Sequence, residues 1–259
     1  AAEIIRYTNA GWADSDITQF KNMLDTVVRP RLIDGSGSNG NWEISMIEGL
    51  MNIGVFNDDR ATFDQGVTYW KQRIPAYFYY HADGPSPVPP PSRRDTKPPA
   101  DLNGLIKFWY NQSTFDARVD GISQETCRDF GHAQYGLAGA LDAAETAYIQ
   151  GVDLYNDAES KAMLRLTSAL EFHAKYLLAY NQNNGYKIPE YICNGVVDFS
   201  SLKPTYEIGY NNYHNRLNIS LPFTNQYLTS VIRQKISTEY HIMVYETLTH
   251  SGDDVFGQR

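Results

Sequence analysis

Apolar residues recur at steps of three and four along most of this chain, which is the spacing of one face of an α-helix. Over residues 16–28 the apolar set is Ile17, Phe20, Met23, Leu24, Val27 and Val28. The strict alternation of apolar and polar residues that indicates a half-buried strand is scarce throughout. The spacing therefore predicts an all-α protein.

Seven helices are expected. The first covers 16–28 and ends at Pro30, the second opens at Asn41 as N-cap, and the third covers 58–80 with Pro75 bending or breaking it. The remaining four are predicted over 124–150, 158–180, 204–217 and 238–250. Long helices joined by polar loops pack as helical hairpins side by side, and the absence of an exact repeat argues against a regular solenoid. A curved array of hairpins around a cavity is the expected architecture.

Residues 84–99 hold seven of the 12 prolines of the chain, which excludes both a helix and a central strand there. Two interpretations stay open: a linker between domains, or a long extended loop over one rim of a helical domain. Because composition changes abruptly nowhere, we expect residues 1–259 to form a single domain that carries this loop. Arg93, Arg94 and Lys97 either reach a polyanion or form a solvated charge cluster.

The formal net charge of −8 argues against a nucleic-acid partner, because phosphate binding needs a basic face. No apolar stretch approaches the ~18 residues of a membrane span. The chain begins Ala1-Ala2-Glu3, which fits a secreted protein whose signal peptide has been removed, although a recombinant product would look the same. The glycosylation sequons at Asn111 and Asn218 are compatible with secretion.

Cys127 and Cys193 are the two cysteines of the chain. In a secreted protein they are expected to pair, which would tether the segment that carries Arg128 and His132 to a later loop. The alternative is two free, buried thiols.

The segment Gln124–His132 holds several ionisable side chains close together in the sequence. On a continuous helix, Glu125, Arg128 and His132 fall at i, i+3 and i+7 and line one face, and the small apolar residues that follow predict that this face is buried. One interpretation is an internal salt bridge with a hydrogen-bonded core histidine. The other is a functional site.

Two further polar segments favour a functional site. Asn39 and Asn41 flank Trp42 near the start of the second helix, and Tyr210 and His214 lie at helical spacing in the segment 206–216. Tyr206 precedes Tyr210 by the same step of four residues, and Tyr213 lies beside them. A solvent-exposed polar helix end is the alternative for this last segment.

Four stretches in order resemble the alginate lyase family of (α/α) toroid polysaccharide lyases: Gly40–Glu43, Gln124–His132, Ala144–Ala147 with Gln150–Tyr155, and Tyr210–Arg216. The resemblance extends over roughly residues 39–250. It implies an incomplete (α/α) toroid of helical hairpins around a cleft. It also implies a monomer whose partner is an acidic polysaccharide substrate.

Members of this family cleave 1,4-linked uronate polymers by β-elimination, without metal or cofactor. The substrate here would be mannuronate-rich alginate or glucuronan. The C5 proton leaves, the glycosidic oxygen on C4 is expelled, and the carboxylate beside C5 must accept additional negative charge. Amide, imidazolium or guanidinium groups aimed at that carboxylate stabilise the transition state. The resemblance gives this role to Asn41, His132 and an arginine, and makes Tyr210 first base and then acid.

A tyrosine hydroxyl normally ionises near pH ~10, so nearby positive charge must favour the phenolate. Arg216, Arg128 and His214 are the candidate sources of that charge, and Tyr213 is a rival to Tyr210 as the base. The catalytic residues implied are Tyr210, His132, Asn41 and Arg216. The implied substrate-binding residues are Trp42, Asn39, Arg128, Tyr213, His214 and Lys203.

Two positions depart from the family pattern. The Asn-His pair of the first motif is replaced by Asn39-Gly40-Asn41, so the imidazole must come from elsewhere. Lys203 stands where the family carries an arginine, seven residues before the tyrosine. Either Lys203 substitutes, or Arg216 or Arg128 acts instead. Trp42 either stacks on a sugar ring or packs in the core.

Two other function classes remain open. A glycoside hydrolase on a similar helical fold would use two carboxylates from Glu43, Glu125, Asp129 and Glu207. A polysaccharide-binding domain would bind without catalysis. A metal enzyme is not expected, because the six histidines show no His-Glu-x-x-His or similar ligand spacing.

Overall fold

The computed structural model describes residues 2–35, 40–93, 97–199, 203, 205–234 and 246–252. Within these ranges the regular secondary structure is helical, and the β pairing is limited to an isolated bridge between Phe78 and Ser123. The all-α prediction is therefore confirmed. Among the described helices, none combines the length and the apolar character that crossing a membrane would require.

A continuous helical run opens the chain after the short helix α1 (Ala2–Tyr7). It consists of α2 (Asp14–Met23), the π-helical turn η1 (Leu24–Val28) and α3 (Arg29–Leu32). The predicted end at Pro30 is wrong. Pro30 lies in the first turn of α3, directly after the π-helical turn, and the run continues to Leu32.

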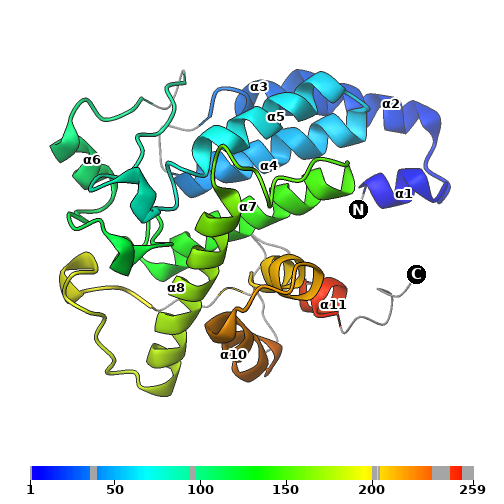
Figure 1. The fold of residues 1–259 in the computed structure, drawn as a ribbon. Coiled ribbons are helices and arrows are strands. Elements are labelled where there is room, and N and C mark those ends of the chain that lie inside the picture. The colour runs from blue at the N-terminus through cyan, green and yellow to red at the C-terminus, as the bar shows by residue number, and fades with distance from the viewer. Residues whose placement is uncertain are drawn as a thin grey trace.

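The centre of the molecule is formed by α4 (Gly40–Asn57), α5 (Arg60–Arg73) and α7 (Phe130–Ile149), which lie side by side in Figure 1. α4 and α5 form a tight hairpin. Asp59 caps α5 by accepting hydrogen bonds from the backbone N–H groups of Ala61 and Thr62. A side chain at Gly54 would place a Cβ 2.5 Å from the backbone nitrogen of Phe63, so the two helices approach as closely as glycine allows.

α4 and α7 run parallel. Near their carboxyl ends, Thr146 Oγ1 donates to Asn52 Oδ1 over 3.2 Å, and Gly139 in the middle of α7 packs against Ile44 near the start of α4. At the other end, Glu125, just before α7, binds Asn41 in the first turn of α4. The first turn of α4 is therefore tied to the turn that precedes α7.

The long helix α8 (Ala162–Gln182) crosses this layer steeply (Figure 1). α10 (Pro222–Ser230) packs on it, and Glu171 of α8 accepts hydrogen bonds from the backbone of Phe223 and Thr224 at the start of α10. The predicted helix 204–217 appears as α9 (Glu207–Tyr210) continued by the π-helical turn η5 (Asn211–Arg216). Of the predicted helix 238–250, the part within the described residues is α11 (Glu246–His250).

The remaining elements are short. They are α6 (Leu102–Phe108) and the 3-10 turns η2 (His81–Asp83), η3 (Ala117–Val119), η4 (Cys193–Gly195) and η6 (Ile232–Gln234). The described part of the proline-rich segment is not helical, as its composition predicts. Arg93 anchors it to the core, because its guanidinium pairs with Glu43 over 3.0 Å and lies 3.7 Å from the centre of the Tyr69 ring. Arg94 lies outside the described residues.

The predicted helix 124–150 begins later than expected, at Phe130, so the idea of one continuous helical face from Glu125 to His132 is wrong. Residues 124–128 form turns instead. Local polar groups explain the change. Thr126 Oγ1 accepts the backbone N–H of Ser123, and Asp129 accepts the backbone N–H of His132 over 2.7 Å, as the N-cap of α7.

Candidate functional site

Glu125 is the centre of the candidate site. Its side chain is fully buried, and its carboxylate accepts hydrogen bonds from the backbone N–H and the Nδ2 of Asn41, from the Tyr77 hydroxyl and from Arg128. A buried carboxylate needs such partners to offset its lost hydration. We call Asn41, Glu125, Arg128, Asp129 and His132 the Glu125 cluster.

His132 and Arg128 form the accessible rim of the cluster, since each side chain is 32% exposed. Asp129 Oδ2 lies 2.5 Å from His132 Nδ1 and 3.8 Å from Arg128 Nε. Asp129 therefore orients both side chains. Because Nδ1 is occupied, Nε2 is the ring nitrogen that His132 can offer to a ligand.

A second buried ion network lies behind the cluster. Glu43 pairs with Arg73 over 2.9 Å and with Arg93 over 3.0 Å, and Arg73 also donates to Gln124 Oε1. Burial lowers the pKa of Arg73, and the neighbouring Glu43 counteracts that shift. This network fixes the turn that carries Glu125 against the start of α4.

The charges around the cluster are balanced, since Arg73, Arg93 and Arg128 face Glu43, Glu125 and Asp129. The amino ends of α4 and α7 are bound by two of these carboxylates, because Glu125 accepts the backbone N–H of Asn41 and Asp129 accepts that of His132. Arg128 and His132, at the accessible rim, are therefore the groups that can donate to an anion.

Trp42 lies next to Asn41 in the first turn of α4 and is 57% exposed. Core packing is thus not its role, and its indole is accessible beside the cluster. Asn39 lies outside the described residues.

Lys203 approaches the same rim through an aromatic neighbour. Its backbone N–H donates to Gln134 Oε1 over 3.1 Å, and its Nζ lies 4.4 Å from the centre of the Tyr135 ring. The Tyr135 and His132 rings lie 6.1 Å apart between centres. Lys203 and His132 therefore both lie next to the Tyr135 ring.

Tyr210 lies on α9 in a different set of contacts. Its ring stacks on His214 at 4.6 Å between centres, as the four-residue spacing predicts, and it is only 6% exposed. Burial raises the pKa of Tyr210, while Arg233 counteracts that shift and Glu207 adds to it. Arg233 also pairs with Glu207 over 2.7 Å. Arg233, which sequence reasoning missed, is thus the cation near Tyr210.

Tyr213 and Arg216 serve structural contacts. The Tyr213 ring is fully buried and its hydroxyl donates to the backbone oxygen of Tyr155. Arg216 forms two hydrogen bonds to Glu145, of 2.7 and 3.0 Å. Burial opposes ionisation of Glu145, but the nearby His250 and the hydrogen bonds from Arg216 outweigh it and lower the pKa of Glu145 to about 2.

The structure therefore brings together part of the predicted site. Asn41, Arg128 and His132 meet in one cluster, with Trp42 and Lys203 near it. No hydrogen bond, ion pair or ring contact links Tyr210, His214 or Arg216 to the Glu125 cluster in the described part of the chain. Tyr77 and Arg73 were missed by sequence reasoning, because tertiary folding alone brings them to the turn that carries Gln124 and Glu125.

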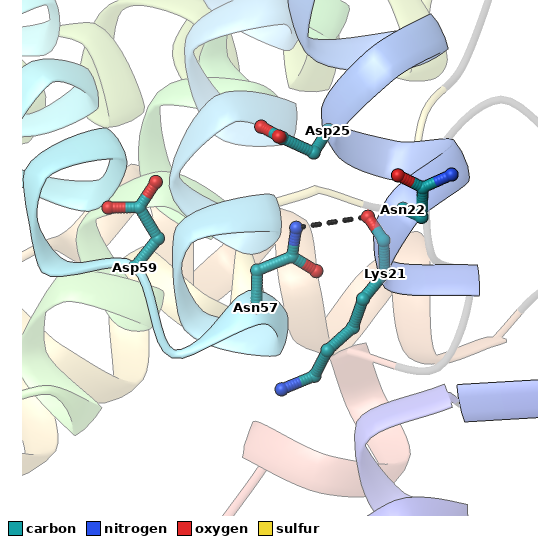
Figure 2. Close-up of a pocket in the computed structure, with 5 residues that line it drawn as sticks. All are labelled: Lys21, Asn22, Asp25, Asn57 and Asp59. Carbon is teal, nitrogen blue, oxygen red and sulfur yellow. Dashed lines mark hydrogen bonds between the residues drawn. The ribbon is translucent and has the colours of Figure 1, made fainter. Parts of the chain in front are cut away.

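A separate pocket of about 290 Å³ lies between the run α2–η1 and the α4–α5 turn (Figure 2). It is lined by Lys21, Asn22, Asp25, Asn57 and Asp59. Its acids already have partners, since Asp25 pairs with Arg29 and Asp59 caps α5. Asn57 Nδ2 donates to the backbone oxygen of Lys21. The polar side chains Asp25, Asp59 and Asn57 of this pocket are therefore engaged in local structural contacts.

The predicted pairing of Cys127 with Cys193 is confirmed, and the disulfide spans 66 residues. It is consistent with an oxidising location, including an extracellular one. Both sequon asparagines, Asn111 and Asn218, are exposed. Within the described ranges, no group of histidine, cysteine, aspartate and glutamate side chains could hold a metal ion.

Comparison with known proteins found no matching family model, no matching curated protein and no matching solved structure. Function must therefore be argued from the residues of this chain and their arrangement.

Proposed function

We propose that this protein is a secreted polysaccharide lyase that cleaves 1,4-linked uronate polymers by metal-independent β-elimination. The observation that carries the proposal is the meeting of Asn41, Arg128 and His132 around the carboxylates of Glu125 and Asp129. The accessible Arg128 and His132 can hold the carboxylate on which negative charge grows during elimination. The motif resemblance supports the same activity.

In the proposed reaction, Arg128 and the Nε2 of His132 bind the uronate carboxylate. Asp129 holds the imidazole in orientation, and Glu125 holds Asn41 and Arg128. A base removes the C5 proton, the electron pair forms the C4–C5 double bond, and the C4–oxygen bond breaks. The leaving oxygen then receives a proton.

Tyr210 is the proposed base and acid. His214 stacks on it, and the positive charge of Arg233 partly offsets the rise in the pKa of Tyr210 that burial causes. The proposal also requires that the helices form an incomplete toroid. The cleft of that toroid would bring Tyr210 to the substrate that the Glu125 cluster holds. Tyr213 is the weaker candidate, because its hydroxyl is fully buried and already donates to Tyr155.

The contacts of the acids support a lyase over a hydrolase. Glu43 and Glu125 are fully buried, and each is paired with arginine. Glu207 is buried against Arg233, and Asp129 orients His132. A hydrolase needs one protonated and one accessible carboxyl group on either side of the scissile bond.

The test is an ultraviolet absorbance assay on polymannuronate, polyguluronate, glucuronan and pectate, with EDTA present. The new double bond conjugated to the carboxylate absorbs, so a lyase yields absorbance together with new reducing ends. Tyr210→Phe and His132→Gln should each lower the rate by about 100-fold or more, as loss of a base or of a transition-state contact does. Tyr7→Phe, at a residue 87% exposed on α1, is the matched control.

Other outcomes of that assay would contradict the proposal. New reducing ends without absorbance would indicate a hydrolase. Retained polymer binding without product over long incubation would indicate a binding domain. Full activity of Tyr210→Phe would show that another group is the base.

A further inference from the structure

Tyr135 lies on α7 one turn beyond His132, so the two side chains share a face of the helix. Their rings lie 6.1 Å apart between centres and meet edge to face, with an angle of 76° between the ring planes. Tyr135 is partly exposed, as are His132 and Arg128. A phenol group is therefore held next to the rim that Arg128 and His132 form.

Lys203 places a positive charge on the Tyr135 ring. The backbone N–H of Lys203 donates to Gln134 Oε1, and its Nζ lies 4.4 Å from the centre of the Tyr135 ring. Because Lys203 is only 6% exposed, water screens its charge weakly. A cation at this place stabilises the phenolate that forms when a tyrosine hydroxyl gives up its proton. The surroundings of Tyr135 therefore suit a proton donor.

β-Elimination needs two proton transfers at different atoms of the substrate, because C5 loses a proton and the leaving oxygen gains one. Tyr210, on α9, is assigned to the first transfer. Tyr77 also contacts the Glu125 cluster, but it is fully buried and its hydroxyl donates to Glu125 over 3.0 Å. Tyr135 combines partial exposure with contact to the rim, so it suits the second transfer.

We propose that Tyr135 is a further catalytic residue, which protonates the glycosidic oxygen as this oxygen leaves C4. The inference rests on the proposed function and moves the second proton transfer from Tyr210 to Tyr135. Tyr210, as phenolate, takes the C5 proton, the electron pair forms the C4–C5 double bond, the C4–oxygen bond breaks, and the Tyr135 hydroxyl gives its proton to that oxygen. Water then carries a proton from Tyr210 to the Tyr135 phenolate, which restores both residues. Tyr135 lies outside the four stretches that resemble the lyase family, so only the structure points to it.

The test compares Tyr135→Phe with the unmodified protein on two substrates. One is the polyuronate that the protein cleaves fastest, and the other is a uronoside that carries nitrophenol on C4, whose expulsion needs no proton. The variant keeps the ring and its contacts with His132 and Lys203. We expect it to cleave the polymer about 100-fold more slowly, as loss of a general acid does, and the nitrophenyl substrate at a near-normal rate. Tyr210→Phe should be slow on both substrates, because the C5 proton must leave in each.

Tyr148→Phe is the matched control, because Tyr148 also lies on α7 and is 44% exposed, and it should leave both rates unchanged. Full activity of Tyr135→Phe on the polymer, while the unmodified protein forms unsaturated product, overturns the inference alone. Equal slowing on both substrates also overturns it, because the expulsion of nitrophenol needs no general acid. An unmodified protein that forms no unsaturated product from any polyuronate overturns the inference and the proposed function together.

Discussion

Asp142 lies on α7 where this helix packs against α4, and its Oδ1 is buried without a hydrogen-bond partner among the described residues. Glu48 of α4 lies close enough for the two carboxyl groups to repel each other. Burial first, and Asp142 second, raise the pKa of Glu48 to about 8. Burial, with a contribution from Glu145, raises the pKa of Asp142 to about 7, although His250 opposes the shift.

These raised pKa values predict how stability depends on pH. Between pH ~4, where the unfolded carboxyls ionise, and the folded values of about 7 and about 8, the folded state holds more protons than the unfolded state. The free energy of unfolding therefore falls as pH rises through this window. Asp142→Asn should be nearly neutral at low pH and stabilise the protein by about 2–3 kcal/mol at high pH.

Urea unfolding at pH 5 and pH 9 would measure this difference. The exposed Asp14→Asn change is the control and should leave the pH dependence as it is. If Asp142→Asn stabilises the protein equally at both pH values, the pKa of Asp142 is not raised in the folded state as predicted.

At the scale of elements, α11 holds the segment that carries Tyr210. The carboxyl group of Glu246, 3% exposed, accepts the backbone N–H of Ile208 over 3.3 Å at the start of α9. Beyond the other end of α9, Asn215 in η5 donates to the backbone oxygen of Gly252 over 3.0 Å. The carboxyl-terminal part of the described chain therefore clamps α9 and η5 at two points.

Removing this clamp should loosen α9 specifically. Glu246→Ala leaves a buried N–H without an acceptor and should cost about 1–3 kcal/mol, whereas Glu246→Gln keeps an acceptor oxygen and should cost less. Amide hydrogen exchange at Ile208 measures the effect, and we expect faster exchange in the alanine variant. Unchanged protection of Ile208 in Glu246→Ala would show that α9 is held by apolar packing alone.

At the scale of the whole molecule, the disulfide joins the site turn to the loop after α8. Cys127 and Cys193 enclose 66 residues of sequence, a stretch that includes all of α7 and α8. Closing a loop of that length removes conformational freedom from the unfolded chain. The same bond fixes the segment against which Gln112 packs.

Loss of the disulfide should therefore destabilise the whole fold. The double change Cys127→Ser and Cys193→Ser should lower the free energy of unfolding by about 4 kcal/mol in the chain-entropy account. Thermal or urea unfolding measures this, and the unmodified protein after reduction should behave like the double variant. If reduction leaves the unfolding midpoint unchanged, residual contacts between the segments of α7 and α8 already restrict the unfolded chain without the disulfide.

Sequence alone determined the all-α class, most helix positions, the disulfide and the proximity of Glu125 to Arg128, because each depends on local spacing or on a pairing with few alternatives. It misplaced the start of α7 and the end at Pro30, where side-chain caps and a π-helical turn outweigh apolar periodicity. The tertiary structure alone decided that α4 and α7 run parallel, so that Asn41 meets Glu125 across 84 residues. It alone paired Arg216 with Glu145 and placed Arg233 near Tyr210, because long-range packing depends on the fit of whole helix faces, which no local sequence pattern shows.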